Sequence, residues 1–141
     1  MKIVIVTGLA GGGKTTALRA LEDLGFFCCD NLPVSLFVTF VNSLESEAIE
    51  KCAISVDGRQ RHFIGDYHGQ ISELREAGHE VEVLFLEAAD AVLLRRYSET
   101  RRRHPLSGDD VKEGIRQDRE ALASLRKEAI IVTEIPYQVN K

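Results

Sequence analysis

Apolar and polar residues alternate along the chain in blocks that predict strands and helices in turn. Short runs rich in Val, Ile, Phe and Leu, several of them closed by Gly or Asp, are typical of buried strands. The segments between them carry apolar residues every three or four positions, as in helices that cover a sheet. The predicted strands are residues 1–8, 26–29, 51–58, 80–88 and 130–135, and the predicted helices are residues 13–25, 34–48, 68–78, 90–103 and 110–129.

This alternation predicts an α/β fold, a three-layer sandwich with a mainly parallel five-stranded sheet. Strands that are joined through helices run parallel, and the helices cover both faces of the sheet. Ligands of such sheets bind beyond the carboxyl ends of the strands. Polar signatures follow three predicted strands, at residues 8–15, at Asp30 and at Asp57, and we expect them to meet at one site.

The segment GLAGGGKTT follows the first predicted strand and matches the phosphate-loop pattern G-x-x-x-x-G-K-[ST]. Its glycines let successive backbone N–H groups turn toward phosphate oxygens, and the helix that follows adds its positive end. Lys14 is expected to reach the β- and γ-phosphates, and the Thr15 hydroxyl to bind Mg²⁺. The residues expected to hold the nucleotide here are Gly8, Leu9, Ala10, Gly11, Gly12, Gly13, Lys14, Thr15 and Thr16.

Two carboxylates end the second and third predicted strands. Asp57 has the position of a Walker-B carboxylate that holds Mg²⁺, although Asp-Gly is also a common exposed turn. Gly58, Arg59 and Gln60 follow it closely enough to touch a base, a ribose or a second ligand. Asp30 either orients a water or an acceptor hydroxyl, or caps the helix after Pro33.

A basic stretch with the sequence LLRRYSETRRRHPL follows the fourth predicted strand. One interpretation is a lid that brings Arg101, Arg102 and Arg103 over the phosphates, where guanidinium groups neutralise developing charge. The alternatives are a basic patch that faces RNA, or a solvated face whose arginines pair with neighbouring carboxylates. Those carboxylates are Glu99, Asp109, Asp110 and Glu113.

Charge, hydropathy and cysteine content narrow the class of protein but indicate no further functional site. The formal net charge of -4 gives no overall reason to bind nucleic acid. No apolar run approaches the ~20 residues needed to cross a bilayer and no signal-peptide pattern opens the chain, so we expect a cytoplasmic protein without membrane contact. Cys28, Cys29 and Cys52 predict no disulfide framework and no metal spacing, and are expected to be small apolar residues near buried strands.

Taken together, these segments resemble the RapZ/YvcJ-type P-loop nucleotide-binding proteins. The resemblance rests on VTGLAGGGKTTALRALEDLGFFCCDNLP, SVDGRQ, EVLFLEAADAVLLRRYSETRRRHPLS and DREALASLRKEA, and it defines a predicted nucleotide-binding domain over residues 1–129. It implies a fold like the nucleoside and nucleotide kinases, binding of ATP and GTP, and modest hydrolysis. It carries the ATP site to Gly8–Thr15 and a GTP-contact segment to Asp57–Gln60. Gln60 departs from the usual Asp-x-Arg-Asn of the family, and Gly12 and Thr15 depart from its serine-containing loop.

Two further departures concern the end of the chain. Members of this family are about twice as long, and their C-terminal domain, which in RapZ is associated with RNA binding and with sensing of an amino-sugar phosphate, is expected to be absent. RNA or a regulatory protein is therefore expected as a partner only through that missing domain. Residues 130–141, IIVTEIPYQVNK, are a possible final strand and an atypical tail that resembles a segment of the DNA gyrase A subunit. We assign no topoisomerase function to them.

The sequence therefore predicts a domain of a regulatory protein that binds ATP or GTP with Mg²⁺ and hydrolyses it slowly. In this interpretation Lys14 and the lid arginines stabilise phosphate charge, Thr15 and Asp57 hold Mg²⁺, and Asp30 positions the water. Two alternatives stay open: a kinase for a small metabolite or nucleotide, and a non-catalytic nucleotide-sensing adapter of RNA or protein. The guanine-specific string Asn-Lys-x-Asp does not occur, which argues against an ordinary GTPase.

Overall fold

The structure is a computed structural model, and it describes residues 1–8, 13–56, 67–87, 91–93, 111–126 and 129–133. All five predicted strands are present, and the helix expected after Pro33 begins with a short 3-10 turn, η1. Of the helix predicted over residues 90–103, residues 91–93 are helical and the others lie outside the described residues. The elements are β1 Lys2–Gly8, α1 Lys14–Asp23, β2 Phe27–Cys29, η1 Val34–Leu36, α2 Phe37–Ser46, β3 Lys51–Ser55, α4 Tyr67–Glu76, β4 Glu80–Glu87, α6 Val111–Arg126 and β5 Ile130–Thr133.

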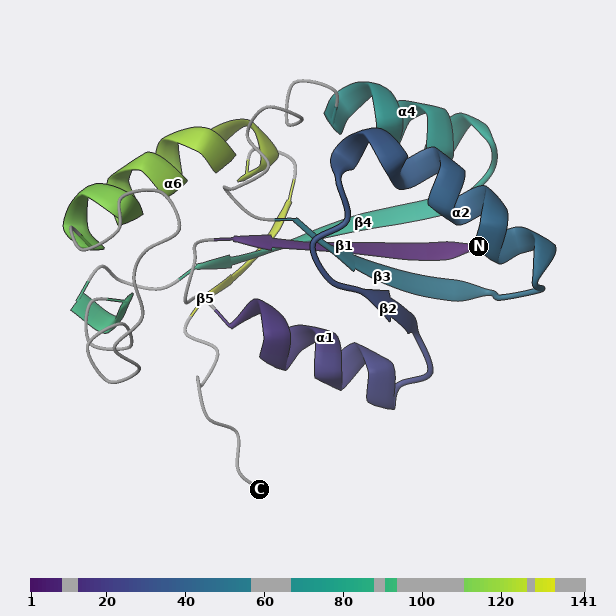
Figure 1. Ribbon diagram of the computed structural model, residues 1–141, viewed down its shortest axis with the longest axis horizontal. Helices are drawn as coiled ribbons and strands as arrows, with labels where there is room; N and C mark the ends of the chain where they lie inside the picture. Colours follow the sequence, from purple (N-terminus) through teal and green to yellow (C-terminus); the bar gives the residue numbers. More distant parts are fainter. Residues whose placement is uncertain (9–12, 57–66, 88–90, 94–110, 127–128, 134–141) are drawn as a thin grey trace.

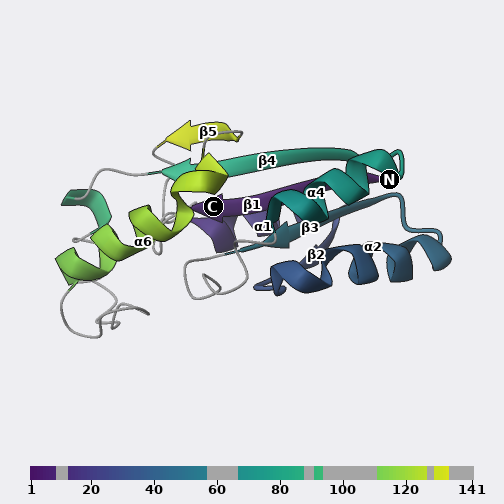
Figure 2. The same cartoon turned by 90° about the horizontal axis from the view of Figure 1, so that it is seen from above.

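The five strands form one parallel sheet in the order β2-β3-β1-β4-β5 (Figure 2). β1 lies in the middle, where Val6 pairs with Ser55 of β3 and with Leu84 of β4. The second strand of the chain is separated from the first by the third, so the ends of β1 and β2 lie on either side of β3. The expectation of a parallel sheet is confirmed.

Helices cover both faces of the sheet, and the side chains of β1 alternate between the two. Ile3 and Ile5 are fully buried in the core that includes α2 and α4, whereas Val4 and Val6 pack with Leu18 of α1. Figure 1 shows the same division, with α2, α4 and α6 on one side of the sheet and α1 on the other. Continuous apolar strands are expected of a sheet that is buried on both faces.

The start of α2 is fixed by a side chain from another helix. No side chain of its own segment caps its first turn, but the Val38 N–H donates to Oε1 of Gln70 in α4 at 3.1 Å. Because the first N–H groups of a helix have no partner within it, this bond satisfies one of them and joins the two helices.

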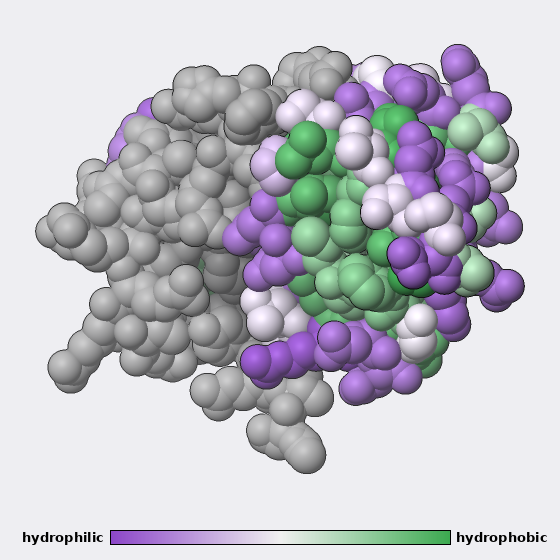
Figure 3. Space-filling view, turned by 45° about the vertical axis from the view of Figure 1, so that its right-hand side comes forward, coloured by the Kyte–Doolittle hydropathy of each residue, from purple (hydrophilic) through white to green (hydrophobic). Residues whose placement is uncertain are grey.

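The surface near the β2 edge carries exposed apolar side chains. Leu24, Phe27 and Leu36 are exposed, and the Phe27 ring lies 6.3 Å from the ring of Phe40. The space-filling view shows apolar side chains gathered in one area and bordered by hydrophilic ones (Figure 3).

In the part of the chain that the structure describes, no helix is both long and apolar enough to span a membrane.

Candidate phosphate site at the carboxyl end of the sheet

The carboxyl end of β1 leaves no room for a side chain. Gly8 has a φ of +142°, and a Cβ atom built on it would lie 2.3 Å from the carbonyl oxygen of Leu86 in β4. A residue with a side chain would both adopt an unfavourable φ and collide with the backbone of the neighbouring strand. The first glycine of the predicted loop is therefore required by the sheet as well as by any phosphate.

The beginning of α1 is uncapped by side chains. Its N-cap residue is Gly13, which is buried and has a φ of 100°, and the first helical bond runs from the Ala17 N–H to the Gly13 carbonyl at 3.0 Å. Within the described part of the chain no side-chain cap bond is found at this helix end, and its first turn contains no acidic residue. Its positive dipole end is therefore left without a negative side chain of its own, which favours an anion at this position.

Lys14 connects the two ends of the loop. Its Nζ donates to the carbonyl oxygen of Gly8 at 3.1 Å, so the ammonium group lies beside the carboxyl end of β1. Thr15 is exposed in the first turn of α1, and Thr16 is half-buried. The remaining loop residues Leu9, Ala10, Gly11 and Gly12 lie outside the described residues.

Asp30 is held by a residue that the sequence analysis missed. The hydroxyl of Ser55, the last residue of β3, donates to Oδ1 of Asp30 and accepts the backbone N–H of Asn31 at 2.8 Å. Ser55 is fully buried and Asp30 is exposed. The segment after Pro33 has no side-chain cap, so the carboxylate of Asp30 bonds to β3 and does not cap that helical turn. The only sequence signal was a hydroxyl inside an apolar run, AISV.

The other expected ligands of the nucleotide are not described. Asp57, Gly58, Arg59 and Gln60 lie outside the described residues, as do the lid candidates Arg101, Arg102 and Arg103. Val56, immediately before this segment, is buried and its N–H donates to the carbonyl of Val6 at 2.9 Å. The last described residue before Asp57 therefore runs beside β1, close to the start of the loop. The alternatives given for these residues stay predictions.

A second polar cluster, also missed, closes the end of β4. Both carboxylate oxygens of Glu87 are engaged by α6, one by Nη1 of Arg119 and the other by Nε of Arg126 at 2.9 Å. Partial burial raises the pKa of Glu87, but the hydrogen bonds from the two arginines outweigh it and hold the pKa below its ordinary value. The cluster attaches α6 to the carboxyl end of the sheet, the end at which the phosphate loop begins.

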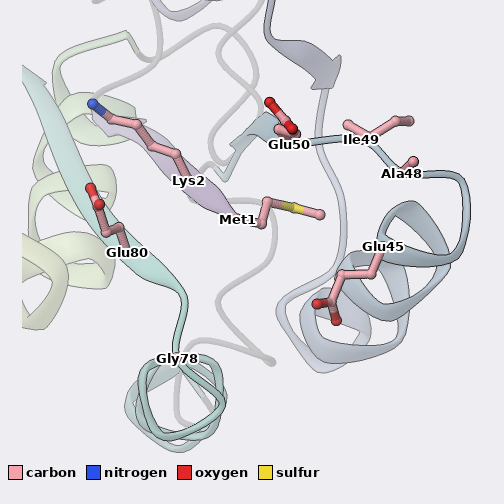
Figure 4. Close-up of a pocket in the computed structure, with 8 residues that line it drawn as sticks. All are labelled: Met1, Lys2, Glu45, Ala48, Ile49, Glu50, Gly78 and Glu80. Carbon is pink, nitrogen blue, oxygen red and sulfur yellow. The ribbon is translucent and has the colours of Figure 1, made fainter.

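A pocket of about 520 Å³ lies at the opposite end of the sheet, where the strands begin (Figure 4). Its lining includes Met1 and Lys2 at the start of β1 and the carboxylates of Glu45, Glu50 and Glu80. Of the candidate site residues that the structure describes, none lines it. Its three glutamates outnumber Lys2 and the N-terminus of Met1, so the lining has a net negative charge and does not favour phosphates.

The fold and the two described ends of the loop define a class of protein. A phosphate-loop sequence connects the central strand of a parallel sheet to an uncapped helix, and its lysine folds back onto the first glycine. This is an α/β P-loop domain with the architecture of small kinases. The chain belongs to the RapZ-like N-terminal domain family, whose model matches residues 1–137. The resemblance stated from the sequence is confirmed, and the match extends beyond residue 129.

Curated relatives are similar over nearly the whole chain. A nucleotide-binding protein of Geotalea uraniireducens (strain Rf4) is 53% identical over 137 residues, which covers 95% of this chain and 48% of that protein. A nucleotide-binding protein of Myxococcus xanthus (strain DK1622) is 52% identical over 127 residues, which covers 89% and 44%. The chain thus spans about half the length of the curated relatives it matches.

Solved structures confirm the predicted fold class. A shikimate kinase from Bacteroides thetaiotaomicron superposes with a TM-score of 0.55 at 20% identity, covering 96% of this chain and 86% of that one. A gluconokinase from Sinorhizobium meliloti 1021 gives a TM-score of 0.54 at 15% identity, covering 94% and 81%. At these identities the likeness concerns the fold alone.

Proposed function

We propose that the chain binds a purine nucleoside triphosphate with Mg²⁺ at the phosphate loop and hydrolyses it slowly, as the nucleotide-binding part of a regulatory protein. One observation carries the proposal: the Lys14 ammonium group and the uncapped start of α1 lie together at the end of the central strand. Both attract anionic oxygens, and the first turn of α1 contains no acidic residue that would repel them. The names of the relatives support a nucleotide as the anion.

The donor set of the loop fits the polyphosphate of a nucleotide. Gly8 and Gly13 have positive φ angles and no side chain that would keep a ligand from the backbone, and Lys14 supplies a positive charge beside Gly8. Mg²⁺ would be held by the exposed hydroxyl of Thr15 together with Asp57, and it would neutralise phosphate charge. The lid arginines Arg101–Arg103 are proposed to add the remaining positive charge.

Hydrolysis requires a water molecule that is held in position to attack, and Asp30 is the residue that we propose to hold it. The water oxygen bonds to the γ-phosphorus while the bond from that phosphorus to the bridging oxygen breaks, and the nucleoside diphosphate leaves with the electron pair. Both water protons remain on the phosphate product, which then releases one to solvent. Lys14 stabilises the negative charge on the phosphate oxygens during this step.

A calorimetric titration with ATP and with GTP, each with and without Mg²⁺, tests the proposal together with a phosphate-release assay. Lys14→Ala is expected to weaken nucleotide binding about 10- to 100-fold, because a charge-assisted contact is lost. Lys2→Ala is the matched control, since Lys2 lies at the opposite end of the same strand. Unchanged affinity and turnover in the Lys14 variant would refute the proposed site.

The same assay separates the two alternatives. A phosphorylated product that forms from a small hydroxyl compound, beyond plain phosphate release, would identify a kinase, for which the exposed carboxylate of Asp30 is a suitable acceptor-binding group. Tight binding without turnover, together with partner affinity that changes with nucleotide, would identify an adapter.

A further inference from the structure

We propose that Ser55 is a positioning residue for the catalytic step, which it serves by fixing the carboxylate of Asp30. The inference rests on the proposed function, because it assumes that Asp30 orients the attacking water. It adds Ser55, the last residue of β3, which the sequence analysis had not assigned to the site. The hydroxyl of Ser55 sets the direction of one carboxylate oxygen and thereby leaves the other in a defined orientation.

The hydroxyl of Ser55 has both of its hydrogen-bonding directions fixed. Its single proton is donated to Oδ1 of Asp30, and its oxygen accepts the N–H of Asn31 at 2.8 Å. A serine hydroxyl that donates and accepts at once cannot rotate freely about its C–O bond. Because Ser55 is fully buried in β3, it is a rigid support for an exposed partner.

The chain after β2 is bent so that two of its groups reach this one hydroxyl. Asn31 adopts a φ of 56°, in the left-handed region that asparagine tolerates better than most residues. The N–H of Asn31 and the carboxylate of Asp30 both bond to the Ser55 hydroxyl, so two neighbouring residues are fastened to the end of β3. The left-handed conformation of Asn31 then turns the chain away immediately after these two bonds.

The carboxylate of Asp30 has little else to hold it. Among the described residues, its bond with Ser55 is the one hydrogen bond found to this group. An exposed carboxylate without that bond would exchange among rotamers, and a water bound to it would lose its fixed direction toward the phosphate. Ser55 therefore acts on the rate through Asp30, whereas a hydroxyl that only stabilised the strand would act on folding alone.

A double-mutant cycle on the complete chain tests this dependence. Ser55→Ala, Asp30→Ala and the double variant are compared for the kcat of phosphate release, for nucleotide affinity and for the urea midpoint of unfolding. Ser46→Ala is the matched control, because Ser46 donates to the carbonyl of Ser43 at 2.7 Å on an exposed part of α2.

Ser55→Ala is expected to lower kcat about 10- to 100-fold, the usual value of a hydrogen bond to a charged group, with nucleotide affinity unchanged. In the Asp30→Ala background the same substitution is expected to cause no further loss of kcat. Should Ser55→Ala fail to fold, Ser55→Cys keeps the size of the side chain with a weaker donor and carries the same expectation.

The outcomes separate the proposed role of Asp30 from the proposed role of Ser55. No phosphate release from the unmodified chain, or full activity of Asp30→Ala, refutes the proposed role of Asp30 and the inference with it. A slow Asp30→Ala variant beside a fully active Ser55→Ala variant overturns the inference alone. So does an equal loss of kcat from Ser55→Ala in both backgrounds, because Ser55 would then act independently of Asp30.

Discussion

Replacement of Gly8 by alanine tests whether the sheet itself fixes the start of the phosphate loop. The added Cβ would lie 2.3 Å from the carbonyl oxygen and 2.9 Å from the nitrogen of Leu86. Ordinary contact with a Cβ begins at 3.4 Å, so the backbone of β4 would have to move by roughly 1 Å. Because β1 pairs with β4 along the whole length of β1, that movement cannot stay local.

The loss of stability in Gly8→Ala has two causes, and a substitution at a second glycine, Gly78, separates them. A positive φ costs a residue with a side chain about 1 kcal/mol, and forcing an atom into filled space costs about 1–3 kcal/mol more. Gly8→Ala should therefore lower the free energy of unfolding by about 2–4 kcal/mol. Gly78→Ala should lower it by only about 1 kcal/mol, because Gly78 has a φ of +95° but no atom within 4 Å of its Cβ position.

Urea unfolding followed by circular dichroism measures both variants, and calorimetry measures their affinity for ATP and GTP. The Gly8 variant should also bind nucleotide more weakly, because the carbonyl that accepts the Lys14 ammonium would shift with the strand. The Gly78 variant should bind nucleotide normally, because Gly78 lies between α4 and β4, at the opposite end of the sheet from the phosphate loop. Equal destabilisation by the two substitutions would refute the steric argument.

Two further predictions concern ionisable groups. Glu87→Gln should cost about 0.5–1 kcal/mol at pH 7, a small value because its arginine partners are partly exposed. Since the pKa of Glu87 lies below its ordinary 4.5, the carboxylate stabilises the fold fully above pH 4.5 and loses that contribution as the pH falls through its lowered pKa. The stabilities of the two proteins should therefore converge once the pH is below that pKa. Burial raises the pKa of Cys52 to about 12 and also raises the pKa of Cys28 and Cys29, so iodoacetamide at pH 7.5 should label all three slowly, and Cys52 only after unfolding. Rapid labelling of native Cys52 would contradict its burial.

Sequence patterns predicted the elements of this fold because each pattern depends on neighbours in the chain. The apolar run of residues 1–8, the glycines that follow it and the helical spacing after Lys14 are local features, and β1 and α1 lie where they were expected. The lysine of the loop was likewise identified from its position in a motif, and its contact with Gly8 spans only six residues.

The contacts that the sequence did not reveal join residues far apart in the chain. Ser55 lies 25 positions from Asp30, and Arg119 lies 32 positions from Glu87. A serine in an apolar run and an arginine on a polar helix have many possible partners. Only the strand order, in which β3 separates β1 from β2, and the packing of α6 against β4 select the partners that are observed.

The strand order also determines when the nucleotide site can form during synthesis. A nascent chain that ends before residue 51 already contains the phosphate loop and Asp30, yet β1 and β2 do not pair with each other and have no common neighbour until β3 is inserted between them. Each β3 pairing closes a long stretch of chain, and such closure is slow compared with helix formation. A site that combines the loop with Asp30, as proposed, would therefore form only after β3 is in place, and nucleotide would stabilise only chains that have reached this stage.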